Sequence, residues 1–197
     1  MAEVRSPLQE VARPGEYGAI DPSGAKLILS QQTLTSLWQI AGWGDFAQAA
    51  ESTLDELGLS GLGDYRAVRS SSAVQCYRIA PDKMWLRDCD TEFLTTAITK
   101  APAGRLTSLD LSHSRVVIGI SGVGSSELLA KLMSIDLSLS SFPADSFAQT
   151  GIHHVAVMIH RLAEDQFELL VPVTWAVSVW DWTCLHAEPM GYRVEAP

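Results

Sequence analysis

Two stretches of the chain share one pattern of apolar residues and glycines, and this internal repeat constrains the fold more than any other feature. The stretches 37–50 (LWQIAGWGDFAQAA) and 117–130 (VIGISGVGSSELLA) align at a constant offset of 80 positions. In each, a strand-like apolar run breaks at two glycines and continues with helical spacing. The aligned glycines are Gly42, Gly44, Gly122 and Gly124. The chain is therefore expected to fold as two similar halves.

A second pair of stretches extends the repeat. Residues 84–98 and 166–180 match in apolar pattern at an offset of 82, with Trp85 opposite Phe167. Both halves then have the order strand, helix, two-stranded hairpin, helix, strand. We predict an α+β fold of two tandem split βαβ (β-α-β-β-α-β) units, with mainly antiparallel sheets and helices packed on one face.

The expected organisation has three segments. Residues 1–24 contain three prolines and few apolar residues, which predicts an extended N-terminal arm. Residues 25–104 form the first βαββαβ lobe and residues 105–197 form the second, as one compact unit. Within the first lobe, Asp45 is the expected N-cap of a helix that stops near Gly58, and Asp90 or Thr91 is expected to cap the next helix.

The charge balance excludes several classes of partner. The chain has 14 Lys+Arg against 23 Asp+Glu, a formal net charge of -9, which opposes binding to a nucleic-acid backbone. It contains no apolar stretch of about 18 residues and no signal-like start, so we expect no membrane contact and a cytoplasmic location. The three cysteines are far apart, which favours reduced thiols with packing roles over disulfides or metal knuckles.

The glycine turns allow two interpretations. A strand, a glycine turn and a helix also form phosphate-binding sites. However, Glu127 stands where the third glycine of G-x-G-x-x-G would be, and no Lys-Ser/Thr pair follows as in a P-loop. Because the same turn occurs twice, we interpret all four glycines as structural and not as a cofactor site.

Other candidate chemistry is weak. His113 beside Arg115 could act as a base with an oxyanion partner, but the pattern supplies no nucleophile and is more typical of a turn. The side chains of His154 and His160 would share one face of a strand, about 20 Å apart by strand rise, which is too far for one metal ion. We therefore predict no catalytic, cofactor-binding or metal-binding residues. The close carboxylates, Asp88 with Asp90 and Glu164 with Asp165, lie at expected turns and helix starts, where capping or solvation explains them.

The apolar face of the last predicted helix is wider than the stripe of about 100° that a surface helix buries. Its tryptophans are Trp175, Trp180 and Trp182. Either both lobes bury this helix, or Trp180 or Trp182 anchors another chain, as large aromatic residues often do. We take the three tryptophans as candidate interface residues.

The run from 105 to 188 resembles the gamma subunit of heterotetrameric sarcosine oxidases. The resemblance rests on SHSRVVIGISG, on FPADSFAQT and on LLVP entering a Trp-rich helix, in that order and spacing. More distantly, the chain is similar to the folate-binding domains of aminomethyltransferases. Residues 25–104 add little to the assignment.

The resemblance implies a non-catalytic, structural subunit of a flavoenzyme that converts sarcosine to glycine, hydrogen peroxide and formaldehyde or 5,10-methylenetetrahydrofolate. Its implied partners are alpha, beta and delta subunits, which would carry NAD, tetrahydrofolate, FAD, covalent FMN and zinc, with no cofactor on this chain. The alternative is an independent folate-binding one-carbon-transfer protein. Fold kinship alone does not transfer folate binding, because function resides in sites.

Overall fold

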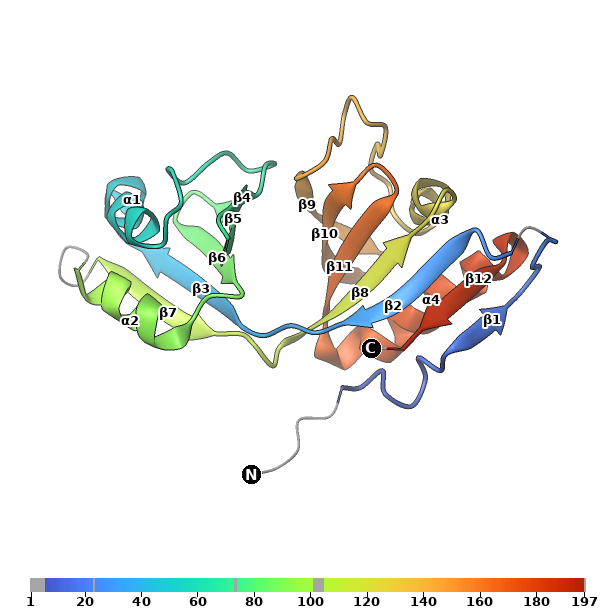
Figure 1. Ribbon diagram of the computed structural model, residues 1–197. Coiled ribbons are helices and arrows are strands. Elements are labelled where there is room, and N and C mark those ends of the chain that lie inside the picture. Colours follow the sequence, from blue (N-terminus) through green and yellow to red (C-terminus); the bar gives the residue numbers. More distant parts are fainter. Residues whose placement is uncertain (1–5, 23, 73, 101–104, 197) are drawn as a thin grey trace. The chain divides into compact units, whose positions relative to one another are not determined.

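The computed structural model describes residues 6–22, 24–72, 74–100 and 105–196. Within them the chain is a mixed α/β protein with four α-helices and two mainly antiparallel sheets (Figure 1). It divides into two compact units. Unit 1 combines the residues up to Thr33 with those from Ser114 onward, and unit 2 is Leu34–His113. No helix of the described residues is both long and apolar enough to cross a lipid bilayer.

Unit 2 is built on a five-stranded sheet with the order β4-β5-β6-β3-β7. All its neighbouring strands are antiparallel. Its elements in chain order are β3 (Leu37–Gly42), α1 (Phe46–Glu56), β4 (Arg69–Ser70), β5 (Gln75–Ala80), β6 (Lys83–Arg87), α2 (Thr91–Lys100) and β7 (Leu106–Asp110).

Unit 1 is built on a seven-stranded sheet with the order β1-β12-β2-β8-β11-β10-β9. Its strands pair antiparallel except for β12 and β2, which are parallel. Its elements are β1 (Gly15–Tyr17), β2 (Leu27–Gln32), β8 (Arg115–Ser121), α3 (Ser125–Leu132), β9 (Phe147–Ile152), β10 (Val155–Ala163), β11 (Gln166–Pro172), the 3-10 turn η1 (Val173–Trp175), α4 (Ala176–Ala187), the 3-10 turn η2 (Glu188–Met190) and β12 (Tyr192–Glu195).

The two sheets contain the same arrangement of four strands. The order β4-β5-β6-β3 in unit 2 matches β9-β10-β11-β8 in unit 1. The hairpins β5–β6 and β10–β11 each have a register shift, between Arg78 and Ala80 and between Arg161 and Ala163. These shifts superpose the hairpins at an offset of 83, and not at the expected 82, so that Phe167 corresponds to Met84 and not to Trp85.

The structure differs from the expected lobes in two respects. Both units contain more strands than the four of the six-element unit: unit 2 adds β4, and unit 1 adds β1, β2 and β9. The boundaries also differ from 25–104 and 105–197, since β2 pairs with β8 in unit 1 while β7 pairs with β3 in unit 2. The reason is that each of these strands completes the open edge of a sheet that is formed by residues distant in sequence.

The N-terminal segment packs on unit 1, although its composition predicted a separate extended arm. Leu8 is fully buried and belongs to the core of this unit. Strand β1 pairs with β12, and the rings of Tyr17 and Tyr192 stack with their centroids 5.3 Å apart. The buried Leu8 and the backbone pairing of β1 with β12 thus attach this segment to unit 1, although the segment is poor in apolar residues.

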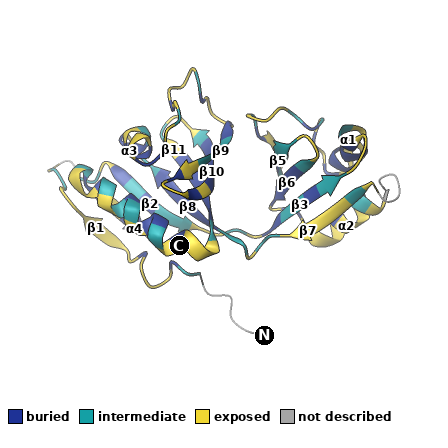
Figure 2. Ribbon diagram, turned by 180° about the vertical axis from the view of Figure 1, so that it is seen from behind, coloured by how far each residue is buried: buried dark blue, intermediate teal, exposed yellow. Residues whose placement is uncertain are grey.

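Each unit has its own hydrophobic core, in which both helices cover the same face of the sheet. In unit 2, Phe46 and Leu54 of α1 and Leu94 of α2 share a cluster with Ile40 and Leu86 of the sheet. In unit 1, residues from α3 and α4 share a cluster with alternate residues of β8, β10 and β11. Figure 2 shows the central strands buried, whereas β7 and much of α2 are exposed.

The predicted helix starts are confirmed in unit 2. The Oδ1 atom of Asp45 accepts the backbone N–H of Gln48 at 3.3 Å, and Oδ1 of Asp90 accepts that of Phe93 at 2.9 Å. Each carboxylate satisfies one of the free N–H groups that begin a helix.

Candidate functional site

The paired glycine turns have a packing role in both units. The N–H of Gly42 donates to the carbonyl of Asp82 at 3.1 Å, and that of Gly122 donates to the carbonyl of Asp165 at 2.9 Å. A Cβ atom at Gly122 would lie 2.1 Å from the carbonyl oxygen of Lys26, just before β2. At Gly42 it would lie 2.6 Å from that of Arg105, just before β7. Both glycines therefore allow the backbone of a neighbouring strand to approach closely.

The backbone conformations of the two turns differ. Gly122 has a φ of 104°, whereas Gly42 does not have a positive φ. For the second glycine of each turn, the positive φ is in unit 2 and not in unit 1. Gly44 has a φ of 64°, whereas Gly124 is the N-cap of α3 with a φ of -90°. The turns occupy the same place but do not have the same geometry, so they do not form a duplicated ligand cradle.

The polar run around His113 forms the turn between β7 and β8. The hydroxyl of Ser112 donates to Oδ1 of Asp110 at 2.6 Å, and its oxygen accepts the N–H of Leu37 at 3.0 Å. This hydrogen bonding lowers the pKa of Asp110. Arg115 donates to the carbonyl of Ser114 at 3.0 Å, while His113 is exposed. These contacts stabilise the turn.

The histidines of unit 1 have separate positions. His153 and His154 form the tight turn between β9 and β10, and His153 has a φ of 51°. They precede β10, so His154 is not on the strand where the sequence placed it. His160 is buried within β10. In the part of the chain that the structure describes, no group of three or more His, Cys, Asp or Glu side chains could hold a metal ion.

The tryptophans of the last helix divide into two groups. Trp180 is 2% exposed and belongs to the core of unit 1, so its proposed role as an interface anchor is wrong. Trp175 is 39% exposed, and its ring meets His154 edge-on at 5.0 Å. Trp182 is half-buried, and its ring meets His153 edge-on at 4.5 Å. The turn between β9 and β10 therefore supports both tryptophans.

An apolar surface surrounds these two tryptophans on α4. We call it the α4 surface and define it by five residues: Val173, Trp175, Val177, Trp182 and Leu185. Leu185 is 60% exposed. Val173, Val177 and Leu185 lie in one row along η1 and α4, because they are separated by four and eight positions, and the exposed Asp181 lies in this row between Val177 and Leu185. Neighbouring exposed large hydrophobic residues of this kind mark protein interaction sites.

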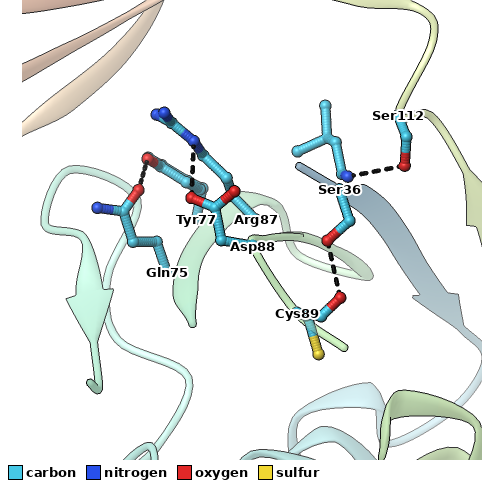
Figure 3. A network of polar contacts seen from close by, with 8 residues as sticks. Ser36, Gln75, Tyr77, Arg87, Asp88, Cys89 and Ser112 are labelled. Atoms are coloured by element: carbon cyan, nitrogen blue, oxygen red, sulfur yellow. Dashed lines mark hydrogen bonds and ion pairs between the residues drawn. The ribbon is translucent and has the colours of Figure 1, made fainter. Parts of the chain in front are cut away.

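A polar network in unit 2 connects β6 to the start of β3 (Figure 3). The hydroxyl of Ser36 donates to the carbonyl of Cys89 at 2.7 Å, and the N–H of Asp88 donates to the carbonyl of Ser36 at 3.0 Å. Arg87 is buried, and its Nε lies 3.3 Å from Oδ2 of Asp88, whose φ is 59°. The network explains this unusual backbone conformation, because it holds the residue from both sides.

The three cysteine thiols have raised pKa values. Burial raises the pKa of Cys76 to about 12 and that of Cys89 to about 11. Burial also raises the pKa of Cys184 to about 11, and a hydrogen bond with Tyr192 partly opposes this shift. None of them resembles a nucleophilic cysteine, which needs a lowered pKa.

Sequence reasoning missed two arginines that the fold places at equivalent positions. Arg78 and Arg161 stand at the register shifts of the two hairpins. Arg78 donates through Nη1 to the carbonyl of Gly63 at 3.2 Å, and its guanidinium lies 4.6 Å from the ring centre of Tyr65. Arg161 donates through Nη1 to the carbonyl of Phe142, and its guanidinium lies 4.5 Å from the ring centre of Phe167.

The fold is similar to that of two solved proteins. A chain of the heterotetrameric sarcosine oxidase from Corynebacterium sp. U-96 has a TM-score of 0.79 and 18% identity, and the similarity covers 98% of each chain. The aminomethyltransferase T of the glycine cleavage system from Bartonella henselae has a TM-score of 0.60 and 16% identity. This second similarity covers 92% of the present chain and 58% of the transferase. No protein-family model and no curated protein sequence matches the chain.

Proposed function

We propose that the chain is the gamma subunit of a heterotetrameric sarcosine oxidase complex and has a structural role in its assembly. The observation that carries this proposal is the extent of the similarity, which covers 98% of both this chain and a chain of such an oxidase. The reaction would be the oxidative demethylation of sarcosine to glycine, hydrogen peroxide and formaldehyde or 5,10-methylenetetrahydrofolate.

The side chains agree with a role outside the chemistry. Asp45 caps a helix, the hydroxyl of Ser112 donates to Asp110 in a turn, and Asp88 pairs with Arg87. The pKa of the Cys184 thiol is raised. In the proposed complex, FAD, covalent FMN, NAD, tetrahydrofolate and zinc belong to the alpha, beta and delta subunits. The location of the complex would be cytoplasmic.

The α4 surface is the proposed contact with a larger subunit. Its exposed apolar residues include Trp175, whose ring meets His154 edge-on. The ring of Trp182 meets both His153 and His154 edge-on. A rigid aromatic side chain that is already fixed in place loses little conformational freedom when a partner covers it.

Purification through a tag on this chain, after co-expression with the candidate partner subunits, tests the proposal. We expect larger subunits in fixed stoichiometry by native mass spectrometry and a flavin absorption spectrum. A colourless chain that is purified alone, and that is as stable alone as in the mixture, would contradict it.

The second candidate is an independent folate-binding one-carbon-transfer protein, which the similarity to aminomethyltransferase T favours. The chain covers only 58% of that protein, which leaves two-fifths of the transferase without a counterpart here. Calorimetric titration of the purified chain with tetrahydrofolate separates the two candidates. A micromolar Kd, about -8 kcal/mol, would support folate binding, and the absence of both heat and a shift in melting temperature would exclude it.

A further inference from the structure

A group of basic and aromatic side chains gathers around Gly63 in unit 2. Arg78 on β5 donates to the carbonyl of Gly63 and lies against the ring of Tyr65. Arg69 on β4 folds over the same glycine, since a Cβ atom there would lie 3.0 Å from both Cγ and Nε of Arg69. We call Tyr65, Arg69 and Arg78 the arginine surface.

The turn that carries Tyr65 is held in place locally. Oδ1 of Asp64 accepts the N–H groups of Arg66 at 2.8 Å and of Ala67 at 2.7 Å. These two bonds lower the pKa of Asp64, and the charges of Arg69 and Arg66 lower it further. The carboxylate is therefore directed at the backbone, and it does not form an ion pair with Arg69 or Arg78.

The guanidinium of Arg78 has hydrogen-bond donors that the described residues do not use. Its Nε is buried without a partner, and Nη1 donates to Gly63. Its counterpart Arg161 has a second acceptor, the hydroxyl of Ser126, 3.1 Å from Nη2. The residue that corresponds to Ser126 in unit 2 is Phe46, 80 positions earlier, which has no acceptor. Arg78 thus lacks the side-chain acceptor that Arg161 has at Nη2, whereas the Nε atoms of both arginines are buried without a partner.

The charges around Arg78 are also unbalanced. Residues 64–81 contain three arginines and one acidic residue, Asp64, in a chain whose formal net charge is -9. Neither Arg69 nor Arg78 forms an ion pair within the described residues. Asp64 offsets only one of the three positive charges, since the charges of Arg69 and Arg66 lower its pKa. The guanidinium groups of Arg69 and Arg78, which meet at one glycine, therefore repel each other unless a further negative charge lies beside them.

The exposure of the surface favours a polypeptide over a small anion. Tyr65 is 47% exposed and Arg69 is exposed. An ion pair between groups that water surrounds contributes only about 0–1 kcal/mol, so a free anion binds weakly there. A partner that covers Tyr65 removes this water and strengthens the same ion pairs. Tyrosine and arginine are also the residue types that contribute most to protein interfaces.

We propose that the arginine surface docks an acidic segment of a partner subunit, whose Asp or Glu carboxylate lies between Arg69 and Arg78 while an apolar part of the segment covers Tyr65. This inference rests on the proposed function, because it requires an assembled complex. The contact is separate from the α4 surface, since it lies in unit 2 and α4 lies in unit 1.

Cross-linking of the purified complex tests the inference directly. A carbodiimide couples a lysine amine to a carboxylate without a spacer, and it does not couple arginine. The Arg69→Lys variant should therefore give a new cross-linked peptide that joins position 69 to an Asp or Glu of another subunit. Arg105→Lys is the matched control, because Arg105 is an exposed arginine of unit 2 outside the arginine surface.

Charge reversal gives the second readout. Arg69→Glu should weaken the affinity for the partner subunits about tenfold or more and reduce its dependence on salt, whereas Arg105→Glu should change neither. The inference fails if the complex assembles but position 69 gives no intersubunit cross-link, or if both glutamate variants bind normally. It also fails if the chain alone binds inorganic phosphate and Arg69→Glu abolishes that binding. A chain that purifies without partner subunits would instead overturn the proposed function, and this inference with it.

Discussion

Arg78 and Arg161 occupy the same position in the two halves of the chain, and each donates through Nη1 to a backbone carbonyl of the loop that follows the first helix of its unit. The two residues differ in burial, because Arg161 is 1% exposed and Arg78 is half-buried. The arginine at this position is therefore closed off from solvent in unit 1, which we call the closed form, and partly open to solvent in unit 2, which we call the open form. The open form is the one that we infer to accept a partner.

The first prediction follows from this difference. Arg161→Met should destabilise the protein by about 2–4 kcal/mol, because it leaves the carbonyl of Phe142 and the hydroxyl of Ser126 without their donor. Arg78→Met should cost about 1 kcal/mol, since water can reach that loop. Urea unfolding followed by tryptophan fluorescence measures both. Equal losses would show that the two arginines are equally buried in solution.

The second prediction concerns the glycine turn. Gly122→Ala should destabilise the protein by about 3 kcal/mol or more, because the new Cβ atom would meet the carbonyl of Lys26 at 2.1 Å and the residue has a φ of 104°. Gly44→Ala is the matched control, since a φ of 64° would strain an alanine but nothing lies within 4 Å of the added Cβ atom. It should cost about 1 kcal/mol. A Gly122→Ala protein with normal stability and lost flavin turnover would contradict the packing role.

The third prediction separates stability from assembly on α4. Trp180→Ala should cost about 3–5 kcal/mol of folding free energy, because the side chain is buried in the core of unit 1. Trp175→Ala should change the stability by within about 1 kcal/mol but should weaken co-purification with the larger subunits. Thermal unfolding and native mass spectrometry give the two readouts. Normal assembly of the Trp175→Ala variant would argue against the α4 surface as a contact.

The fourth prediction concerns alkaline pH. Because the folded pKa values of the cysteines lie at about 11 to 12, above the ordinary value of 9.0, the folded state holds its thiol protons more tightly than the unfolded state does. Their contribution to stability is complete below about pH 9, and it is lost as the pH rises through 11. Melting temperatures measured from pH 8 to 11 should fall across this range.

Thiol labelling provides an independent check of the same shifts. At pH 8 the folded protein should react slowly with iodoacetamide at all three cysteines, because the thiolate is the reactive form. Unfolding in urea should release three rapidly labelled thiols, which mass spectrometry would count. Fast labelling of Cys184 in the folded protein would show that its pKa is not raised.

Much of the architecture could be predicted from local patterns. The offset of 80 between the glycine turns reappears as two equivalent hydrogen bonds, from Gly42 to Asp82 and from Gly122 to Asp165. The caps at Asp45 and Asp90 were also predictable, because an N-cap depends on residues within one turn of the helix.

One further signal was present in the sequence and was missed. The segments RIAPDK (78–83) and RLAEDQ (161–166) share their arginine, alanine and aspartate at an offset of 83. Aligning the later apolar residues at an offset of 82 concealed this match. Apolar residues substitute for one another, so their pattern tolerates a shift of one position that a polar motif does not.

The sequence alone determined the repeat, the glycine turns and the helix starts of unit 2, because these depend on short-range periodicity and on backbone geometry. Only the tertiary structure decided that β2 completes the sheet of unit 1 and β7 that of unit 2, since any strand of suitable pattern can complete an open sheet edge. It also decided that Trp180 is buried while Trp175 is exposed. Both outcomes depend on which surfaces meet after folding, and the local sequence around each residue does not contain that information.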